Sequence, residues 1–205
     1  MSPVVDRSQR PNGNHTITWS GASTSPNGDA PSYPTSTVSF TSGVSTTTLT
    51  ATLFAAGSNS LTASASSPSL TGTTTISVSA ASATRLAWTH ISSTSGTAIP
   101  SPCLFTCSYS SFGNSKSFTA NVGVTDNFGN TVNNLGSGHS VSVAFASGNN
   151  GTITGGSLTI SSTGAADSTT QFTYTSKSSG NYTDGVAAAT SAGTSYTNAI
   201  ATFIR

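Results

Sequence analysis

An alternation of Ser or Thr with apolar residues recurs along this chain from residue 15 to residue 204 and constrains its fold most strongly. A period of two is typical of a β-strand with one buried face, because successive side chains of a strand point to opposite sides. An apolar stripe at helical spacing is absent from the sequence. The pattern predicts strands over 15–20, 36–42, 45–54, 59–65, 73–80, 84–91, 116–126, 139–146, 156–162, 168–176, 181–190 and 195–204.

The composition is rich in hydroxyls and poor in charge. Ser and Thr provide 78 of the 205 residues, and only 5% of residues are Asp, Glu, Lys or Arg. Such a composition also occurs in disordered stalks, but the regular placement of apolar and aromatic residues favours folded β-structure. The net charge of +1 gives no electrostatic basis for binding nucleic acid. No apolar run is long enough to predict membrane insertion.

Two similar segments divide the chain. HTITWSG at 15–21 and HSVSVAF at 139–145 each follow a Gly/Asn cluster, and the segments downstream of them align in the same order. The second copy has further strands upstream of its histidine, over 84–91 and 116–126, whereas the first copy lacks the first of these strands and most of the second. We therefore predict an incomplete β-sandwich over 1–82 and a complete β-sandwich over 83–205, with roughly seven to nine strands in the second.

Several motifs of the second copy carry a resemblance to a known family. They are VTDNFGNTV (124–132), GHSVSVAF (138–145), GSLTISSTGAA (156–166) and GNYTDGVAA (180–188). In the first copy, DAPSYP (29–34) and the region VSFTSGVSTTTLTATLFAAGSNSLTA (38–63) contribute. With these motifs the chain resembles bacterial immunoglobulin-like modules of the Big type, related to invasin and intimin. The resemblance implies tandem immunoglobulin-like sandwiches from a large surface or secreted protein, and such modules also occur in phage virion proteins.

The inventory of reactive side chains argues against an enzyme. The chain has five Asp, no Glu and three His, and the common hydrolase, metalloprotease and nucleotide-binding motifs are absent. We predict no catalytic residue, no metal site and no cofactor. Asp126 lies in an Asp-x-x-Gly turn, where one acid is too few for calcium. The histidines are expected to bond nearby loop carbonyls.

Cys103 and Cys107 are the only cysteines. Five fully extended residues would hold their Cα atoms too far apart for a disulfide, but Pro100 and Pro102 favour a turn that brings them together. We rank a small-loop disulfide first, two free thiols second and a metal site last.

Two sets of residues are candidates for an interaction face. Thr46, Thr48, Thr50 and Thr52 would lie on one face of the strand expected at 45–54, although Thr is also an ordinary outer residue of a sandwich. Tyr33 and Tyr109 lie in loops and are candidates for exposed contacts, whereas Trp19 and Trp88 are expected in the core.

The expected function is a structural or adhesive module at the bacterial cell surface or outside the cell. Its expected partners are other immunoglobulin-like modules or copies of itself, joined by strand addition at the incomplete first domain. A phage head decoration or tail appendage on the virion surface is the first alternative. An ice-binding or surface-glycan-binding module is the second.

Overall fold

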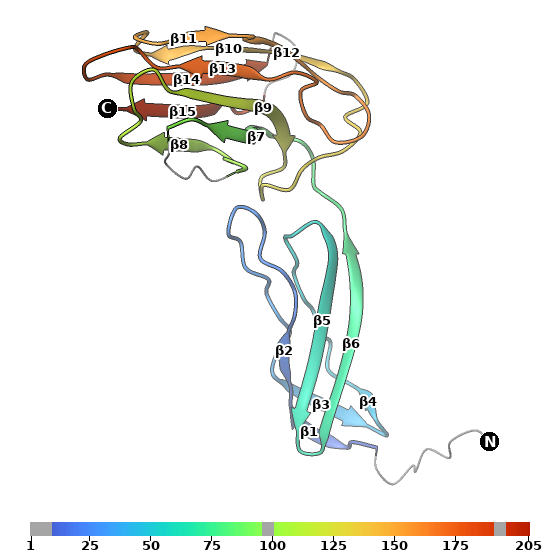
Figure 1. Cartoon of the computed structure of the whole chain (residues 1–205). Coiled ribbons are helices and arrows are strands. Elements are labelled where there is room, and N and C mark those ends of the chain that lie inside the picture. Colours follow the sequence, from blue (N-terminus) through green and yellow to red (C-terminus); the bar gives the residue numbers. More distant parts are fainter. Residues whose placement is uncertain (1–9, 96–100, 191–195) are drawn as a thin grey trace, which may run out of the picture. The chain divides into compact units, whose positions relative to one another are not determined.

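The computed structural model describes residues 10–95, 101–190 and 196–205. The chain divides into two compact units, Met1–Ser79 (unit 1) and Ala80–Arg205 (unit 2), where the sequence placed the boundary after residue 82. The described residues form strands, turns and loops without a helix (Figure 1). Accordingly, this part of the chain contains no helix of the length and hydropathy required to cross a bilayer.

Unit 2 contains two antiparallel sheets that enclose one core. The larger sheet has the order β12-β10-β14-β15-β8, and the smaller sheet has the order β11-β13-β9-β7. The strands are β7 (Arg85–Ser93), β8 (Thr106–Tyr109), β9 (Ser117–Thr125), β10 (His139–Ser147), β11 (Thr152–Thr154), β12 (Ser157–Ile160), β13 (Phe172–Thr175), β14 (Thr183–Thr190) and β15 (Ala199–Ile204). β8 is the exception to antiparallel pairing, because it runs parallel to β15. This arrangement is an immunoglobulin-like β-sandwich.

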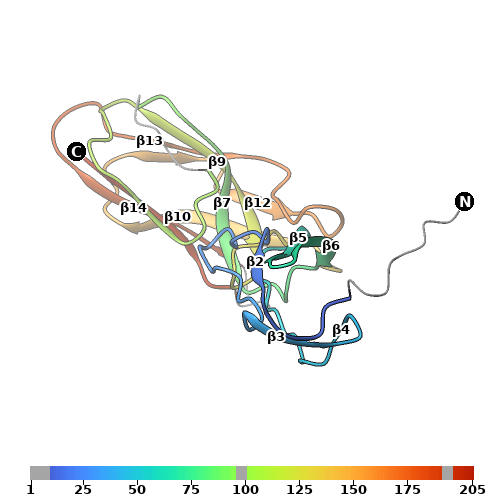
Figure 2. The ribbon, with the colours of Figure 1, turned by 90° about the horizontal axis from the view of Figure 1, so that it is seen from below.

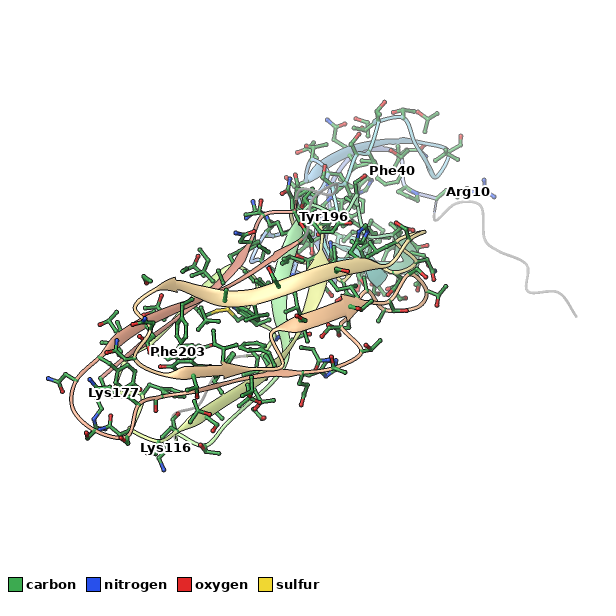
Figure 3. The ribbon with its side chains drawn as sticks, turned by 90° about the horizontal axis from the view of Figure 1, so that it is seen from above. Arg10, Phe40, Lys116, Lys177, Tyr196 and Phe203 are labelled. Atoms are coloured by element: carbon green, nitrogen blue, oxygen red, sulfur yellow. A yellow bond between two sulfur atoms is a disulfide. The ribbon has the colours of Figure 1, made fainter. Side chains whose placement is uncertain are left out.

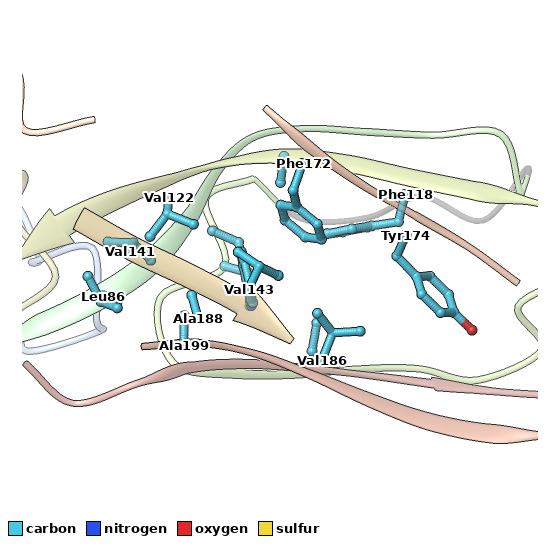
Figure 4. Close-up of a cluster of buried hydrophobic side chains, with 14 of the residues drawn as sticks. Leu86, Phe118, Val122, Val141, Val143, Phe172, Tyr174, Val186, Ala188 and Ala199 are labelled. Carbon is cyan, nitrogen blue, oxygen red and sulfur yellow. The ribbon is translucent and has the colours of Figure 1, made fainter. Parts of the chain in front are cut away.

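The core of unit 2 is built from the inward positions of both sheets (Figure 4). Along β9, Phe118, Ala120, Val122 and Val124 are buried at every second position, as the alternation predicts. Phe203 of β15 is fully buried (Figure 3), and its ring centroid lies 4.2 Å from that of Tyr174 in a stacked geometry.

Two adjacent glycines carry the chain between the sheets of unit 2. β11 pairs with β13, whereas β12, which starts two residues later, pairs with β10. Gly155 has a φ of +68°, and a Cβ at Gly156 would lie 2.6 Å from the carbonyl oxygen of Val143. Only glycine fits both the left-handed backbone and this close approach. The pair therefore lets one short segment contribute to both layers.

Unit 1 contains two three-stranded sheets. One has the order β1-β3-β4 and the other β2-β5-β6. The strands are β1 (Gly13–Thr16), β2 (Thr18–Ser20), β3 (Thr37–Thr41), β4 (Val44–Ser45), β5 (Gly57–Ser66) and β6 (Ser69–Val78). β5 and β6 run side by side as a long hairpin with no register shift (Figure 1), while β3 and β4 form a short one (Figure 2).

Strand pairings of the two units match along the repeat. β10 pairs with β12 and β14, and β14 with β15; in unit 1, the segment 13–20 pairs with β3 and β5, and β5 with β6. No described strand of unit 1 corresponds to β7, β9 or β13. The structure thus confirms the expected fold class of immunoglobulin-like β-sandwiches, and the described part of unit 1 lacks these three strands.

The strand expected at 45–54 is wrong. Only Val44–Ser45 forms a strand there, and the residues up to Phe54 are irregular apart from one bridge between Ser32 and Thr52. In the repeat this segment aligns with β13, which pairs with β9 in unit 2. Its β-propensity is not sufficient without a partner strand, since a strand needs a neighbour for its backbone hydrogen bonds. The short strands β8 and β11 were not expected from the sequence.

Candidate interaction site on unit 1

The inner face of the β2-β5-β6 sheet has few apolar contacts. Among the described residues, unit 1 buries three apolar side chains, Ile17, Val38 and Ala55, whereas unit 2 buries twenty-three. The large side chains of Val44 and Leu70 are 67% and 49% exposed. Unit 1 therefore has the strands of one half of a sandwich without the core that the other half would complete.

Equivalent positions in the two units show this difference directly. Residues that pair across two strands lie on the same face of a sheet. Trp19 pairs with Ala63 in unit 1, and the aligned residues of unit 2, Val143 and Ala188, pair in the same way. Val143 and Ala188 are buried, whereas Trp19 and Ala63 are half-buried. Trp88 lies in the core as expected, but Trp19 is only half-buried, because no described strand of unit 1 covers this side of the β2-β5-β6 sheet.

The β5–β6 pairs are also less buried than their counterparts in unit 2. Asn59 pairs with Ile76 and Leu61 with Thr74 in unit 1, as Asp184 pairs with Phe203 and Val186 with Ala201 in unit 2. Phe203 and Ala201 are fully buried, but their counterparts Ile76 and Thr74 are half-buried and exposed. These positions face an open side of unit 1.

A groove of about 390 Å³ opens between the two small sheets of unit 1. Its apolar lining includes Ile17, Phe40, Ala63 and Leu70, and the His15 ring meets the Phe40 ring edge-on at 5.7 Å. None of the described residues that line the groove carries a carboxylate, an ammonium or a guanidinium group. The groove therefore suits an uncharged, apolar segment.

A free strand edge borders this sheet. Within the described residues β6 pairs only with β5, whereas its counterpart β15 pairs with β14 on one side and with β8 on the other. An unpaired edge presents a row of backbone donors and acceptors to a further strand. Unit 1 thus offers both a backbone edge and an apolar groove.

Two equivalent polar residues, Asn59 and Asp184, accept hydrogen bonds from the loop that follows the histidine-containing strand segment of each repeat. Asn59 accepts a hydrogen bond from the Ser23 amide at 3.1 Å and donates to the Ala55 carbonyl at 2.8 Å. Asp184 accepts hydrogen bonds from the amides of Asn150 and Gly151 at 3.0 and 2.9 Å and from the Tyr174 hydroxyl at 2.9 Å. Burial alone would raise the pKa of Asp184, but these hydrogen bonds together hold the pKa below its usual value.

The four candidate threonines are exposed, but they do not form a row. Thr46, Thr48 and Thr50 lie outside any strand, and Thr52 makes only the isolated bridge with Ser32. The expectation that they share one strand face is therefore wrong, for the reason given for the 45–54 segment.

Neither candidate tyrosine is an exposed contact. Tyr33 is half-buried, and its hydroxyl accepts a hydrogen bond from the Ala22 amide at 3.2 Å. Tyr109 is 5% exposed, since it lies on β8 and its ring stacks on that of Phe203 at 5.3 Å. The prediction of an exposed loop position for Tyr109 failed because β8 was not recognised as a strand of the larger sheet.

Cys103 and Cys107 are joined by a disulfide with a Cα–Cα separation of 6.3 Å. Cys103 also exchanges two backbone hydrogen bonds of 2.9 Å with Trp88 on β7. Because Cys107 belongs to β8 in the other sheet, the bridge ties the segment that crosses from one layer to the other.

His15 and Asp126 bond nearby backbone groups, whereas for His90 the expectation of a loop carbonyl is wrong, because its Nε2 contacts the Asp167 carboxylate. His15 lies 3.1 Å from the Asn12 carbonyl oxygen and 3.2 Å from that of Ser67, as expected for a histidine beside loops. Asp126 accepts hydrogen bonds from the amides of Phe128 and Asn130, both at 2.9 Å, which confirms the predicted turn. The described residues include no cluster of three His, Cys, Asp or Glu side chains placed to hold a metal ion.

Sequence comparison gave no relative: no family model matches the chain, and no curated protein matches it. Six chains of solved structures are similar to this chain, among them the three that follow. The D00-D0 domain of intimin is 16% identical over 96% of this chain and 88% of that one, with a TM-score of 0.37. A glycosyl hydrolase family 2 member from Bacteroides cellulosilyticus is 16% identical over 80% of this chain and 21% of that one, with a TM-score of 0.39. Domains 4 and 5 of the S-layer protein SbsC are 14% identical over 77% of this chain and 62% of that one, with a TM-score of 0.25. The function proposed below therefore rests on the strands and contacts of this chain itself.

Proposed function

We propose that the chain is a non-enzymatic structural and adhesive module that assembles by strand addition at unit 1. The observation that carries the proposal is the open side of unit 1, where the free edge of β6 adjoins an apolar groove. A strand donated there would gain main-chain hydrogen bonds from the edge, while its apolar side chains would fill the groove.

The donor we propose is a strand of a second copy. β9 has the required chemistry: it is the strand beside β13, it alternates small polar residues with Phe118, Val122 and Val124, and it carries no charged side chain. Because β9 is buried within unit 2 of its own copy, the strand that a second copy has free to donate is the edge of its own β6. A peptide of the β9 sequence would pair with the β6 edge in the same way and place its apolar side chains beside Leu61 and Ile76.

Sedimentation velocity of the full chain over a range of concentrations tests this proposal. We expect reversible self-association that Ile76→Lys weakens, because a charge on the inner face cannot be buried unpaired. Thr75→Lys is the matched control: it lies next to Ile76 on the opposite, exposed face and should associate like the wild type. A compact monomer at every concentration would contradict the proposal.

The location we propose is the cell surface or the extracellular space, with the virion surface as the alternative. Antibody labelling of intact producing cells would detect the chain in the first case. In the second, it would be found in purified phage particles.

A second candidate function, binding to an ordered surface such as ice, is favoured by the other face of the β2-β5-β6 sheet. Every side chain on that face is a hydroxyl, and the cross-strand pair Thr62–Thr73 lies at 3.0 Å. The equivalent face of unit 2 contains apolar residues such as Ala187 and Ile200. The hydroxyl face comprises Thr18, Ser20, Ser58, Ser60, Thr62, Ser64, Ser66, Ser69, Thr71, Thr73, Thr75 and Ser77.

An ice recrystallisation assay tests this second function. Combined Thr73→Tyr and Thr75→Tyr substitutions should abolish inhibition, because they interrupt the lattice on a regular strand. Combined Thr48→Tyr and Thr50→Tyr substitutions should have no effect, since those residues lie outside the strands. Absence of inhibition by the wild-type chain would eliminate the function.

A further inference from the structure

A polar pocket of about 240 Å³ lies within unit 2, on the outer side of β7 and β9. Thr89 and His90 line it from β7, Thr125 from the end of β9, and Asp167 from the segment before β13. Pro102 and Leu104 form an apolar wall. None of the candidate residues predicted from the sequence is among the residues that line it.

The backbone around the pocket departs from regular strand geometry. The pairing of β7 with β9 shifts register between Thr89 and Ser92, and His90 inside this bulge has a φ of +47°. A left-handed backbone is uncommon for a residue other than glycine and is enriched at functional sites. The bulge directs the imidazole toward Asp167, where its Nε2 lies 3.1 Å from Oδ2.

Asp167 is held across the sheet by two contacts. Its Oδ1 accepts a hydrogen bond from the Thr89 hydroxyl, and its Oδ2 contacts His90. Beneath it lies Gly123, where a Cβ would come within 2.7 Å of Oδ1, so the glycine makes room for the carboxylate. Each carboxylate oxygen has two lone pairs, which leaves acceptor capacity on both.

Thr125 provides an independent indication of a ligand. The residue is 3% exposed, and among the described residues its Oγ1 has no hydrogen-bond partner. Buried hydroxyls are generally paired, and an unpaired one is destabilising. In this conformation Oγ1 is enclosed by protein, so a ligand in the pocket would supply the missing hydrogen bond once the Thr125 side chain rotates about its Cα–Cβ bond.

We propose that this pocket binds one monosaccharide unit of a glycan through two neighbouring hydroxyls of the sugar. One sugar hydroxyl donates to the Asp167 carboxylate and the other bonds Thr125 Oγ1, while the C–H side of the ring rests on Pro102 and Leu104. The chemistry of the lining favours this ligand, because a single carboxylate is too few for calcium and the described lining residues include no Lys or Arg to hold an anion. The inference deepens the adhesive part of the proposed function and rests on it.

The test is a titration of the isotopically labelled full chain with mannose, glucose, galactose and fucose, followed by amide NMR shifts, together with a glycan array. We expect at least one sugar to shift the amides of Thr125, Gly129 and Asp167. Thr125→Val should weaken binding about three- to tenfold, as expected for loss of one hydrogen bond. It should not lower the melting temperature, since the hydroxyl that it removes has no partner in the protein.

Asp167→Asn should weaken binding more strongly, on the order of tenfold to a hundredfold, because it removes a charged acceptor. Asp29→Asn is the matched control, since that carboxylate bonds Ser25 in a turn of unit 1. No shift with any of the sugars, or equal affinity of Thr125→Val and the wild type, would overturn the proposal. Self-association is measured separately, so loss of sugar binding alone would reject the pocket and leave strand addition standing.

Discussion

Truncation of equivalent side chains in the two units should have unequal effects on stability. Phe203 and Ile76 occupy the same position in the repeat, but Phe203 is fully buried and Ile76 is half-buried. The Phe203 ring lies 4.2 to 5.3 Å from four other aromatic rings, those of Tyr174, Phe112, Phe118 and Tyr109. The loss of stability on each truncation therefore tests whether the side chain lies in an enclosed core.

Phe203→Ala should lower the free energy of unfolding of unit 2 by about 3–5 kcal/mol, near the upper end because aromatic contacts are lost with the buried area. This corresponds to a fall in melting temperature on the order of 10–20 °C. Ile76→Ala should cost unit 1 about 1 kcal/mol or less, because its side chain already contacts water and its loss leaves no enclosed cavity.

Urea denaturation followed by tryptophan fluorescence can read the units separately, because each contains one tryptophan. In a Trp88→Phe background Trp19 reports on unit 1, and in a Trp19→Phe background Trp88 reports on unit 2. The measurement requires a concentration at which the chain is monomeric. If Ile76→Ala destabilised unit 1 as much as Phe203→Ala destabilises unit 2, unit 1 would have a closed core and the reasoning would be refuted.

Three further outcomes follow from unit 2. Asp184→Asn should cost about 2–4 kcal/mol at neutral pH, since it removes charge-assisted hydrogen bonds. Because the pKa of Asp184 is held below 3.8, its contribution is present above that pH and is lost as the pH falls through the lowered pKa, so the variant should show a flatter acid limb in urea titrations. Burial raises the pKa of Tyr109 to about 12, so its stabilising contribution is complete below pH 10.0 and lost as the pH rises through 12; alkaline unfolding of Tyr109→Phe should shift to higher pH in circular dichroism. Combined Cys103→Ser and Cys107→Ser substitutions should lower stability by about 2 kcal/mol in urea, as expected for opening a short loop, and a reductant should then have no further effect.

Much of the fold follows from the alternating pattern. β9 and β5 were expected close to their observed bounds, because a half-buried strand shows its period of two in its own sequence. The incomplete first unit followed from comparing the two histidine strands, since a repeat predicts neighbours as well as strands.

Strand-pairing partners and pockets could not be predicted from the sequence, for physical reasons. The 45–54 run has the pattern of a strand but lacks the neighbour it needs, and a pattern does not report its neighbour. Tyr109 was missed because β8 is four residues long and lies between irregular segments. In the polar pocket, Thr125 and Asp167 are 42 positions apart and meet only through the sheet.

The hydroxyl face could have been predicted from the sequence, because β5 and β6 carry a hydroxyl at every second residue. Ser or Thr occupies alternate positions from Ser58 to Ser66 and from Ser69 to Ser77. In a hairpin, these two runs place their hydroxyls on one face, whereas the threonine run at 46–52 lies outside the strands.

Hydrogen exchange of the full chain, with and without a peptide of the β9 sequence SFTANVGVT, tests the open side of unit 1 most directly. In the monomer we expect the amides of β5 and β6 to exchange far faster than those of β9 and β14, because no described strand covers the open side of the β2-β5-β6 sheet. The peptide should slow exchange in β5 and β6, whereas a scrambled peptide should not. Amides of unit 1 as slowly exchanging as those of unit 2 in the free monomer, and unchanged by the peptide, would contradict the account.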